Sequence, residues 1–210
     1  ARLYFSVRSQ EEARHAELSY RLADKFGGYI DAPESDYEDS VSTHGVRRLA
    51  LDADVPVECT VAALVCSAEQ IIFNVFKHIA QITTNPAIRR AYQLILRDEA
   101  RHCAFGWDFI AGRLPHLTAS QRDQVRDAVV TMIEKVELNG YQLAWLAPDS
   151  NASRAQIECD RTLWQAGLGA STEELEKPVF VASLRGIRSR MKEEWGIELP
   201  SFHHPRTGKI

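Results

Sequence analysis

The tetrapeptide Glu-Ala-Arg-His occurs twice in this chain, at residues 12–15 and 99–102. Both copies lie in segments whose apolar residues recur at helical spacing, and residues three apart share one face of a helix. Glu99 and His102 interrupt a stripe whose other members are Tyr92, Ile95, Gly106 and Phe109. A carboxylate on such a stripe costs several kcal/mol unless it is paired, protonated or metal-bound. The repeat therefore favours a helical fold that brings buried carboxylates and imidazoles together.

The rest of the chain also has helical periodicity, without the bounded alternation of strands, and it predicts an all-α fold. We expect helices over about 4–26, 56–83, 86–114, 117–146, 152–167 and 172–195. The acidic stretch 29–55 is a long connection with one short helix near 46–51, and the tail after residue 195 is irregular. We treat residues 1–210 as a single domain, in which 1–114 carries the metal-site helices and 115–210 adds packing helices and the tail.

Composition limits the classes of protein to which this chain could belong. The chain has 210 residues, is 45% hydrophobic and has a formal net charge of -4, so it can bury a core but has no basic stripe for nucleic acid. We find no apolar run close to the ~18 uncharged residues of a membrane span, and expect no membrane partner. None of the four cysteines forms a Cys-x-x-Cys pair. Reduced, buried thiols fit a cytoplasmic protein better than a disulfide framework.

A third carboxylate, Glu69, lies in the middle of the helix expected over 56–83. Its neighbours are apolar: Val65, Cys66, Ile72, Phe73 and Phe76. Glu58 lies in the first turn of the same helix, where a negative charge favours the helix dipole. We therefore interpret Glu58 as structural and Glu69 as functional.

Two Glu-x-x-His pairs and a lone Glu on separate helices resemble the ligands of the ferritin-like di-iron carboxylate superfamily. The order in that family is Glu, Glu-x-x-His, Glu, Glu-x-x-His on four successive helices. The last three match Glu12/His15, Glu69 and Glu99/His102. The resemblance covers roughly residues 1–114. The sequence "RDEARHCAFGW" is closer to the oxygenase branch, which includes p-aminobenzoate N-oxygenase-like and ribonucleotide-reductase-small-subunit-like proteins, than to storage ferritins.

The first Glu of the family pattern has no match. Glu69 precedes Glu99 by 30 residues. If the front half of the bundle is built like the back half, its lone Glu lies about 18 residues before Ala1. We therefore expect a first bundle helix that is missing from the given sequence. The alternative is that a later helix supplies this ligand through Glu134 or Glu137.

The resemblance implies a ferritin-like four-helix bundle and an oxidoreductase function. Two iron ions, or manganese-iron or di-manganese, would bind Glu12, His15, Glu69, Glu99 and His102. Dioxygen would be the co-substrate for hydroxylation, N-oxygenation or desaturation of a small organic molecule. An apolar lining that includes Phe73, Ile95 and Phe105 would hold that substrate. A homodimer and an electron-donor partner are compatible with this interpretation.

Two other functions stay open at this point. Ferroxidase or iron-storage proteins use the same ligand types, although the helices after Leu114 exceed what a storage subunit needs. A metal-free helical interaction module would instead keep an internal Glu-His-Arg network. Glu11, Glu17 and Asp98 are expected on a face that is either solvated or next to the site. Asp98 and Arg101 could hydrogen-bond around the site, because ligating histidines usually need an acceptor on their other ring nitrogen.

Overall fold

The computed structural model describes residues 2–28, 52 and 54–210. This part of the chain is almost entirely helical, which confirms the all-α fold class. The helices are α1 (Arg2–Lys25), α4 (Val57–Thr60), η1 (Val61–Glu69), α5 (Gln70–Ile82), α6 (Pro86–Arg113), α7 (Ala119–Lys135), α8 (Asn151–Gln165), α9 (Glu173–Arg190) and η5 (Met191–Trp195). Short 3-10 turns cover Leu114–His116, Glu137–Asn139 and Ala144–Leu146. The short helix expected near 46–51 lies outside the described residues.

Helix ends follow the local chemistry of the sequence. Asn85 caps α6 by accepting hydrogen bonds from the backbone N–H groups of Ala87 and Ile88, and Pro86 occupies the first turn. Thr118 starts α7 with a capping box completed by Gln121. The helix expected to reach residue 146 stops at Lys135, so that boundary was wrong. Gly140, at φ +84°, makes the turn that sends the chain back, and a Cβ there would collide with Ala147.

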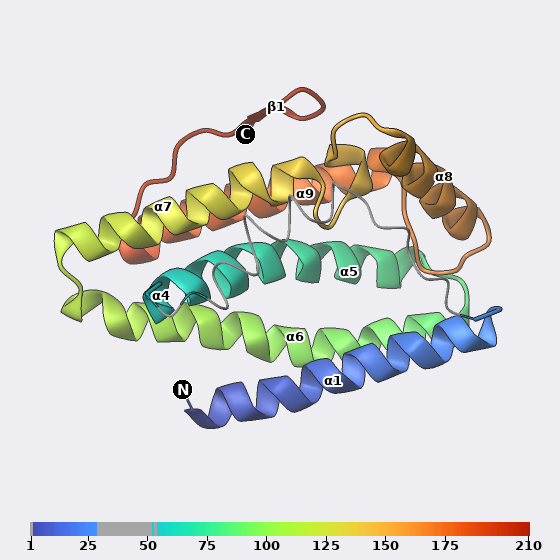
Figure 1. Cartoon of the computed structure of the whole chain (residues 1–210), viewed down its shortest axis with the longest axis horizontal. Helices are drawn as coiled ribbons and strands as arrows, with labels where there is room; N and C mark the ends of the chain where they lie inside the picture. Colours follow the sequence, from blue (N-terminus) through green and yellow to red (C-terminus); the bar gives the residue numbers. More distant parts are fainter. Residues whose placement is uncertain (1, 29–51, 53) are drawn as a thin grey trace.

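Segments α4, η1 and α5 form one continuous central helix, Val57–Ile82. It lies between α6 on one side and α7 and α9 on the other, while α1 runs antiparallel to α6 along its outer side (Figure 1). The apolar core is enclosed by the central helix, α6, α7 and α9. The helices after residue 114 therefore build the core and are not merely appended to it.

The central helix meets the length and composition of a membrane span, contrary to the expectation from the sequence. Its most apolar 18-residue window has a mean hydropathy of 1.6, and 56% of that window is buried inside the protein. The helices that surround it account for its apolar composition, because a helix that is covered on several sides needs apolar residues all round. It is the core helix of this structure.

The π-helical segment η1 packs closely against α6. A Cβ added at Gly106 of α6 would lie 2.7 Å from Cγ1 of Val65, so the glycine leaves room for the Val65 side chain. Such π segments are rare and often mark functional sites. Here the segment ends at Glu69, one of the predicted ligands.

The tail is irregular over residues 196–202, as expected, but it ends in an element that was not predicted. His203–His204 and Gly208–Lys209 pair as a short antiparallel hairpin. Phe202 and Ile210 flank the hairpin, are 1% and 4% exposed, and join the apolar core. These two apolar side chains attach the tail to the rest of the protein.

Candidate metal centre

The two Glu-Ala-Arg-His copies face each other across the α1–α6 interface. His102 Nδ1 lies 3.2 Å from Glu99 Oε2 and 3.5 Å from Glu12 Oε1. His15 Nδ1 lies 3.3 Å from Glu12 Oε2 and 3.4 Å from Glu99 Oε1. The antiparallel packing of α1 and α6 thus brings the Nδ1 atom of each histidine to the carboxylates of both copies.

The other ring nitrogen of each histidine meets an acidic residue of the opposite helix. His102 Nε2 lies 3.0 Å from Glu11 Oε2, and His15 Nε2 lies 3.2 Å from Asp98 Oδ2. Glu11 and Asp98 each precede the Glu of their own copy, so the repeat is five residues long, acid-Glu-Ala-Arg-His. An imidazole that donates its Nε2 proton to a carboxylate keeps a lone pair on Nδ1, which is how ligating histidines are usually oriented.

The arginines of the repeat hold these outer carboxylates. Arg101 forms ion pairs with Glu11 and, at 2.7 Å, with Asp98. Arg14 forms an ion pair with Asp98 and lies 3.8 Å from Glu11. Asp98 is only 1% exposed, so these cations offset the cost of its burial. The expected partnership of Asp98 and Arg101 is present, and both arginines pair with acidic neighbours.

Charge pairing shifts the titration of this network. Burial raises the pKa of Asp98, but hydrogen bonds from Arg14, Arg101 and His15 outweigh it and hold the pKa well below its usual range. Burial likewise opposes ionisation of Glu11, but hydrogen bonds with His102 and Arg101 lower its pKa. Burial disfavours the charged form of His102, whereas the Glu99 and Glu11 carboxylates raise its pKa overall.

Three of the predicted ligands form a group that could hold a cation. One ligand atom from each of Glu12, Glu99 and His102 lies within 4.8 Å of the others. His15 adjoins this group through its contacts with Glu12 and Glu99. The donor set of two carboxylates and imidazole nitrogens suits iron, manganese or zinc better than a soft or an alkaline-earth ion.

Glu69, the fifth predicted ligand, points to the same interface but is held by an arginine. Arg8 of α1 forms ion pairs with Glu69 and, at 3.3 Å, with Glu12. The second carboxylate oxygen of Glu69 is buried and has no hydrogen-bond partner within the described residues. Arg8 was not anticipated from the sequence, although its position one turn before Glu12 could have indicated it. It supplies positive charge where the carboxylates of three helices converge.

An aromatic wall closes one side of the cluster. The Tyr4 ring stacks on Phe105, with centroids 3.5 Å apart, and lies edge-on to His102 at 6.0 Å. Phe105 continues the wall to Phe109 at 5.6 Å. The Tyr4 hydroxyl is buried without a hydrogen-bond partner in the described part of the chain, and burial raises its pKa despite the opposing charge of Arg8. The wall gives this side of the cluster an apolar surface.

The alternative ligands from later helices do not join the cluster. Glu134 is exposed on α7, and the Glu137 side chain is buried and accepts a hydrogen bond from Gln142 at 3.1 Å. Glu58 pairs with Arg113 at 2.7 Å, in keeping with a structural role.

No family model, curated protein or solved structure matches the chain. The function is therefore inferred from the geometry of the α1–α6 interface.

Proposed function

We propose that the chain is a di-metal oxidoreductase of the ferritin-like type, with iron as the leading metal and dioxygen as co-substrate. The observation that carries the proposal is the reciprocal histidine arrangement: each Nδ1 faces the Glu12–Glu99 pair, and each Nε2 faces an acid of the other helix. A buried ion-pair network does not require each histidine to contact an acid of the opposite helix through Nε2. It is the arrangement expected where two imidazoles must present lone pairs to cations.

The proposed roles of the side chains follow from their positions. Glu12 and Glu99 lie between the two histidines and would be shared by the two metals, while His15 and His102 would each serve one metal. Glu69 would complete the set once Arg8 releases it. Carboxylates offset the charge of the cations, and imidazole nitrogens leave positions open for water or dioxygen.

When bound, two iron ions in such a site supply the electrons that reduce dioxygen. The protein would contribute a dry pocket and a place for the substrate. Tyr4, Phe105 and Phe109 present aromatic surface beside His102, which suits a small apolar or aromatic molecule. Insertion of one oxygen atom also needs two electrons from a donor protein or cofactor, and the second oxygen atom leaves as water.

The bundle itself is part of this proposal. Helix α1, the central helix and α6 carry Glu-x-x-His, Glu and Glu-x-x-His in the family order. We propose that a further helix packs beside α1, where Leu3 and Val7 are 79% and 42% exposed, and that it reaches the edge of the cluster and supplies the remaining carboxylate. The buried, unpartnered oxygen of Glu69 supports a site that needs a further partner.

The test is metal content after expression in iron-supplemented medium. The wild type should hold close to two metals per chain, and the Glu99→Ala, His102→Ala double variant should hold almost none. An Asp108→Ala, His116→Ala double variant removes one carboxylate and one imidazole from exposed positions and should keep the metal. Full stability under chelation and no metal in either protein would instead establish a metal-free network.

Assembly size and turnover separate the enzymatic function from iron storage. A monomer or dimer that consumes dioxygen in the presence of an aromatic or amine substrate supports the oxidoreductase. A cage of many subunits that oxidises and retains iron would overturn it in favour of storage.

A further inference from the structure

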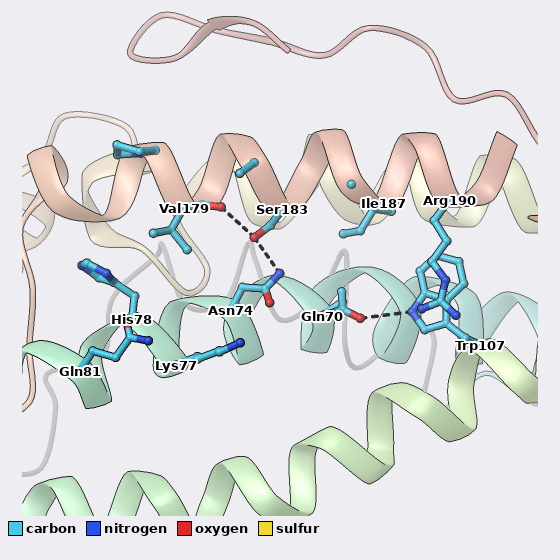
Figure 2. Close-up of a pocket in the computed structure, with 13 residues that line it drawn as sticks. Gln70, Asn74, Lys77, His78, Gln81, Trp107, Val179, Ser183, Ile187 and Arg190 are labelled. Atoms are coloured by element: carbon cyan, nitrogen blue, oxygen red, sulfur yellow. Dashed lines mark hydrogen bonds between the residues drawn. The ribbon is translucent and has the colours of Figure 1, made fainter. Parts of the chain in front are cut away.

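A cavity of about 630 Å³ lies between α5 and α9 (Figure 2). It exists because α9 turns small side chains toward α5. Ala182, Ser183 and Gly186 follow one another along this face, and a Cβ added at Gly186 would meet nothing within 4 Å. Larger residues at these positions would fill the space, so the composition of α9 keeps the cavity open.

The lining of the cavity is positively charged. Its 13 residues include Lys77, His78 and Arg190 but no Asp or Glu. The Lys77 ammonium group has no ion pair within the described residues, although acidic side chains are abundant elsewhere on the surface. A cavity whose lining holds no acid, and in which Lys77 has no ion pair, is suited to an anionic ligand.

Arg190 is held in a fixed orientation at one end of the cavity. Its guanidinium carbon lies 4.0 Å from the centroid of the Trp107 ring, and its Nε donates a 2.6 Å hydrogen bond to Glu194. Trp107 is in turn fixed by a hydrogen bond from its Nε1 to Gln70 and by packing against Trp195. The two terminal nitrogens of Arg190 have no hydrogen-bond partner in the described structure. A planar fork with free terminal nitrogens matches a carboxylate or a phosphate.

Neutral polar groups continue from Arg190 toward the other end. The Asn74 amide donates to Ser183 Oγ at 3.0 Å, and Ser183 donates to the carbonyl oxygen of Val179 (Figure 2). His78 lies beyond them, at the opposite end from Arg190. Its Nε2 is buried without a partner within the described residues, which is costly unless a ligand or water pairs with it. The cavity thus offers a cationic end, a polar middle and an imidazole.

We propose that this cavity binds a small organic anion, whose carboxylate or phosphate pairs with the terminal nitrogens of Arg190 and whose polar body extends past Asn74 toward Lys77 and His78 (Figure 2). The site is distinct from the metal centre, because none of its lining residues is among the metal-centre residues at the α1–α6 interface. The proposal does not depend on metal binding or on the oxidoreductase function.

The test is isothermal titration of the full chain with 4-hydroxybenzoate, phenyl phosphate and the neutral analogue 4-hydroxybenzamide. We expect one of the anions to bind one site per chain with a Kd of about 1 mM or tighter, and the amide not to bind. The tighter of the two anions identifies carboxylate or phosphate as the preferred group. No saturable binding of either anion at about 10 mM would overturn the proposal.

Variants place the binding in this cavity. Gly186→Leu fills open space without touching a charge and should abolish binding, whereas Gly112→Leu makes the same change at an open helical position on α6 and should not. Lys77→Gln should weaken binding about tenfold, and Lys135→Gln, an exposed lysine of α7, should leave it unchanged. Unaltered binding in Gly186→Leu, with the fold intact by circular dichroism, would contradict the assignment.

Discussion

Asp98 and Glu137 are both buried carboxyls, each 1% exposed, but their surroundings shift their pKa values in opposite directions. Asp98, at the α1–α6 interface, accepts hydrogen bonds from arginines, which hold its pKa well below the usual range. Glu137, packed behind the central helix, has Gln142 as its hydrogen-bond partner, and burial raises its pKa to about 8. One region keeps its acid charged by supplying cations, and the other keeps its acid neutral.

Helices α1 and α9 are also held in place by different kinds of contact. The single buried residue of α1 is Glu11, so polar contacts dominate the docking of this helix. Helix α9 instead buries Phe180, Leu184 and Ile187 in the apolar core. We infer that α1 can be released by removing charges while the core stays folded.

The largest expected effect comes from Asp98→Ala. This change removes one shared acceptor of Arg14 and Arg101, which are half exposed and keep Glu11 as a partner, so we expect a cost of about 1.5–3 kcal/mol. Hydrogen exchange should show α1 amides losing protection while α9 amides keep theirs. Leu184→Ala, a core truncation costing about 2–5 kcal/mol, should lower the protection of both. An equal loss of amide protection in α1 and α9 of Asp98→Ala would contradict the inference that α1 can be released while the core stays folded.

The pH dependence of Glu137 sharpens the comparison. Burial raises its pKa in the folded state above the ordinary value of 4.5, so the folded state binds the extra proton and stability falls as pH rises from about 4.5 to 8. Glu137→Gln retains an acceptor for Gln142 and removes this loss. Thermal melts should show no gain at pH 4 and a gain of about 1–3 kcal/mol at pH 8.

Two controls accompany the Glu137 melts. Glu134→Gln, at an exposed neighbouring position, should show no such pH-dependent gain. Metal content should also be unchanged in both variants, because neither residue joins the cluster. A loss of bound metal in the Glu137→Gln variant would instead indicate that Glu137 is a metal ligand.

A smaller effect is expected from Arg8→Gln. Arg8 pairs with Glu69 and Glu12, so a metal must displace it before Glu69 can bind. Its removal should tighten manganese binding to the apo-protein by about tenfold, which is about 1.4 kcal/mol. Calorimetric titration measures this change, and Arg21→Gln, which breaks an exposed pair with Glu17, serves as the control. Weaker binding in Arg8→Gln would show that the arginine assembles the site.

Helical periodicity and capping residues were sufficient to predict most of the helices. Asn85 and Pro86 marked the start of α6 correctly, because caps depend on local sequence. The π-helical segment and the end of α7 at Lys135 were not predictable, since both depend on contacts between helices. The repeat predicted that Glu99 and His102 share a face, but it could not reveal that α1 runs antiparallel to α6 or that Arg8 reaches Glu69.

The exchange of acids between the two copies of the repeat makes them interdependent. Glu11 holds the histidine of the second copy, and Asp98 holds the histidine of the first. A substitution at Glu11 therefore removes the partner of His102, which lies 91 positions away along the chain. The contact between His15 and Asp98 stays in place. Each copy thus depends on the other for the orientation of its histidine, and a change to one acid is felt first in the other copy.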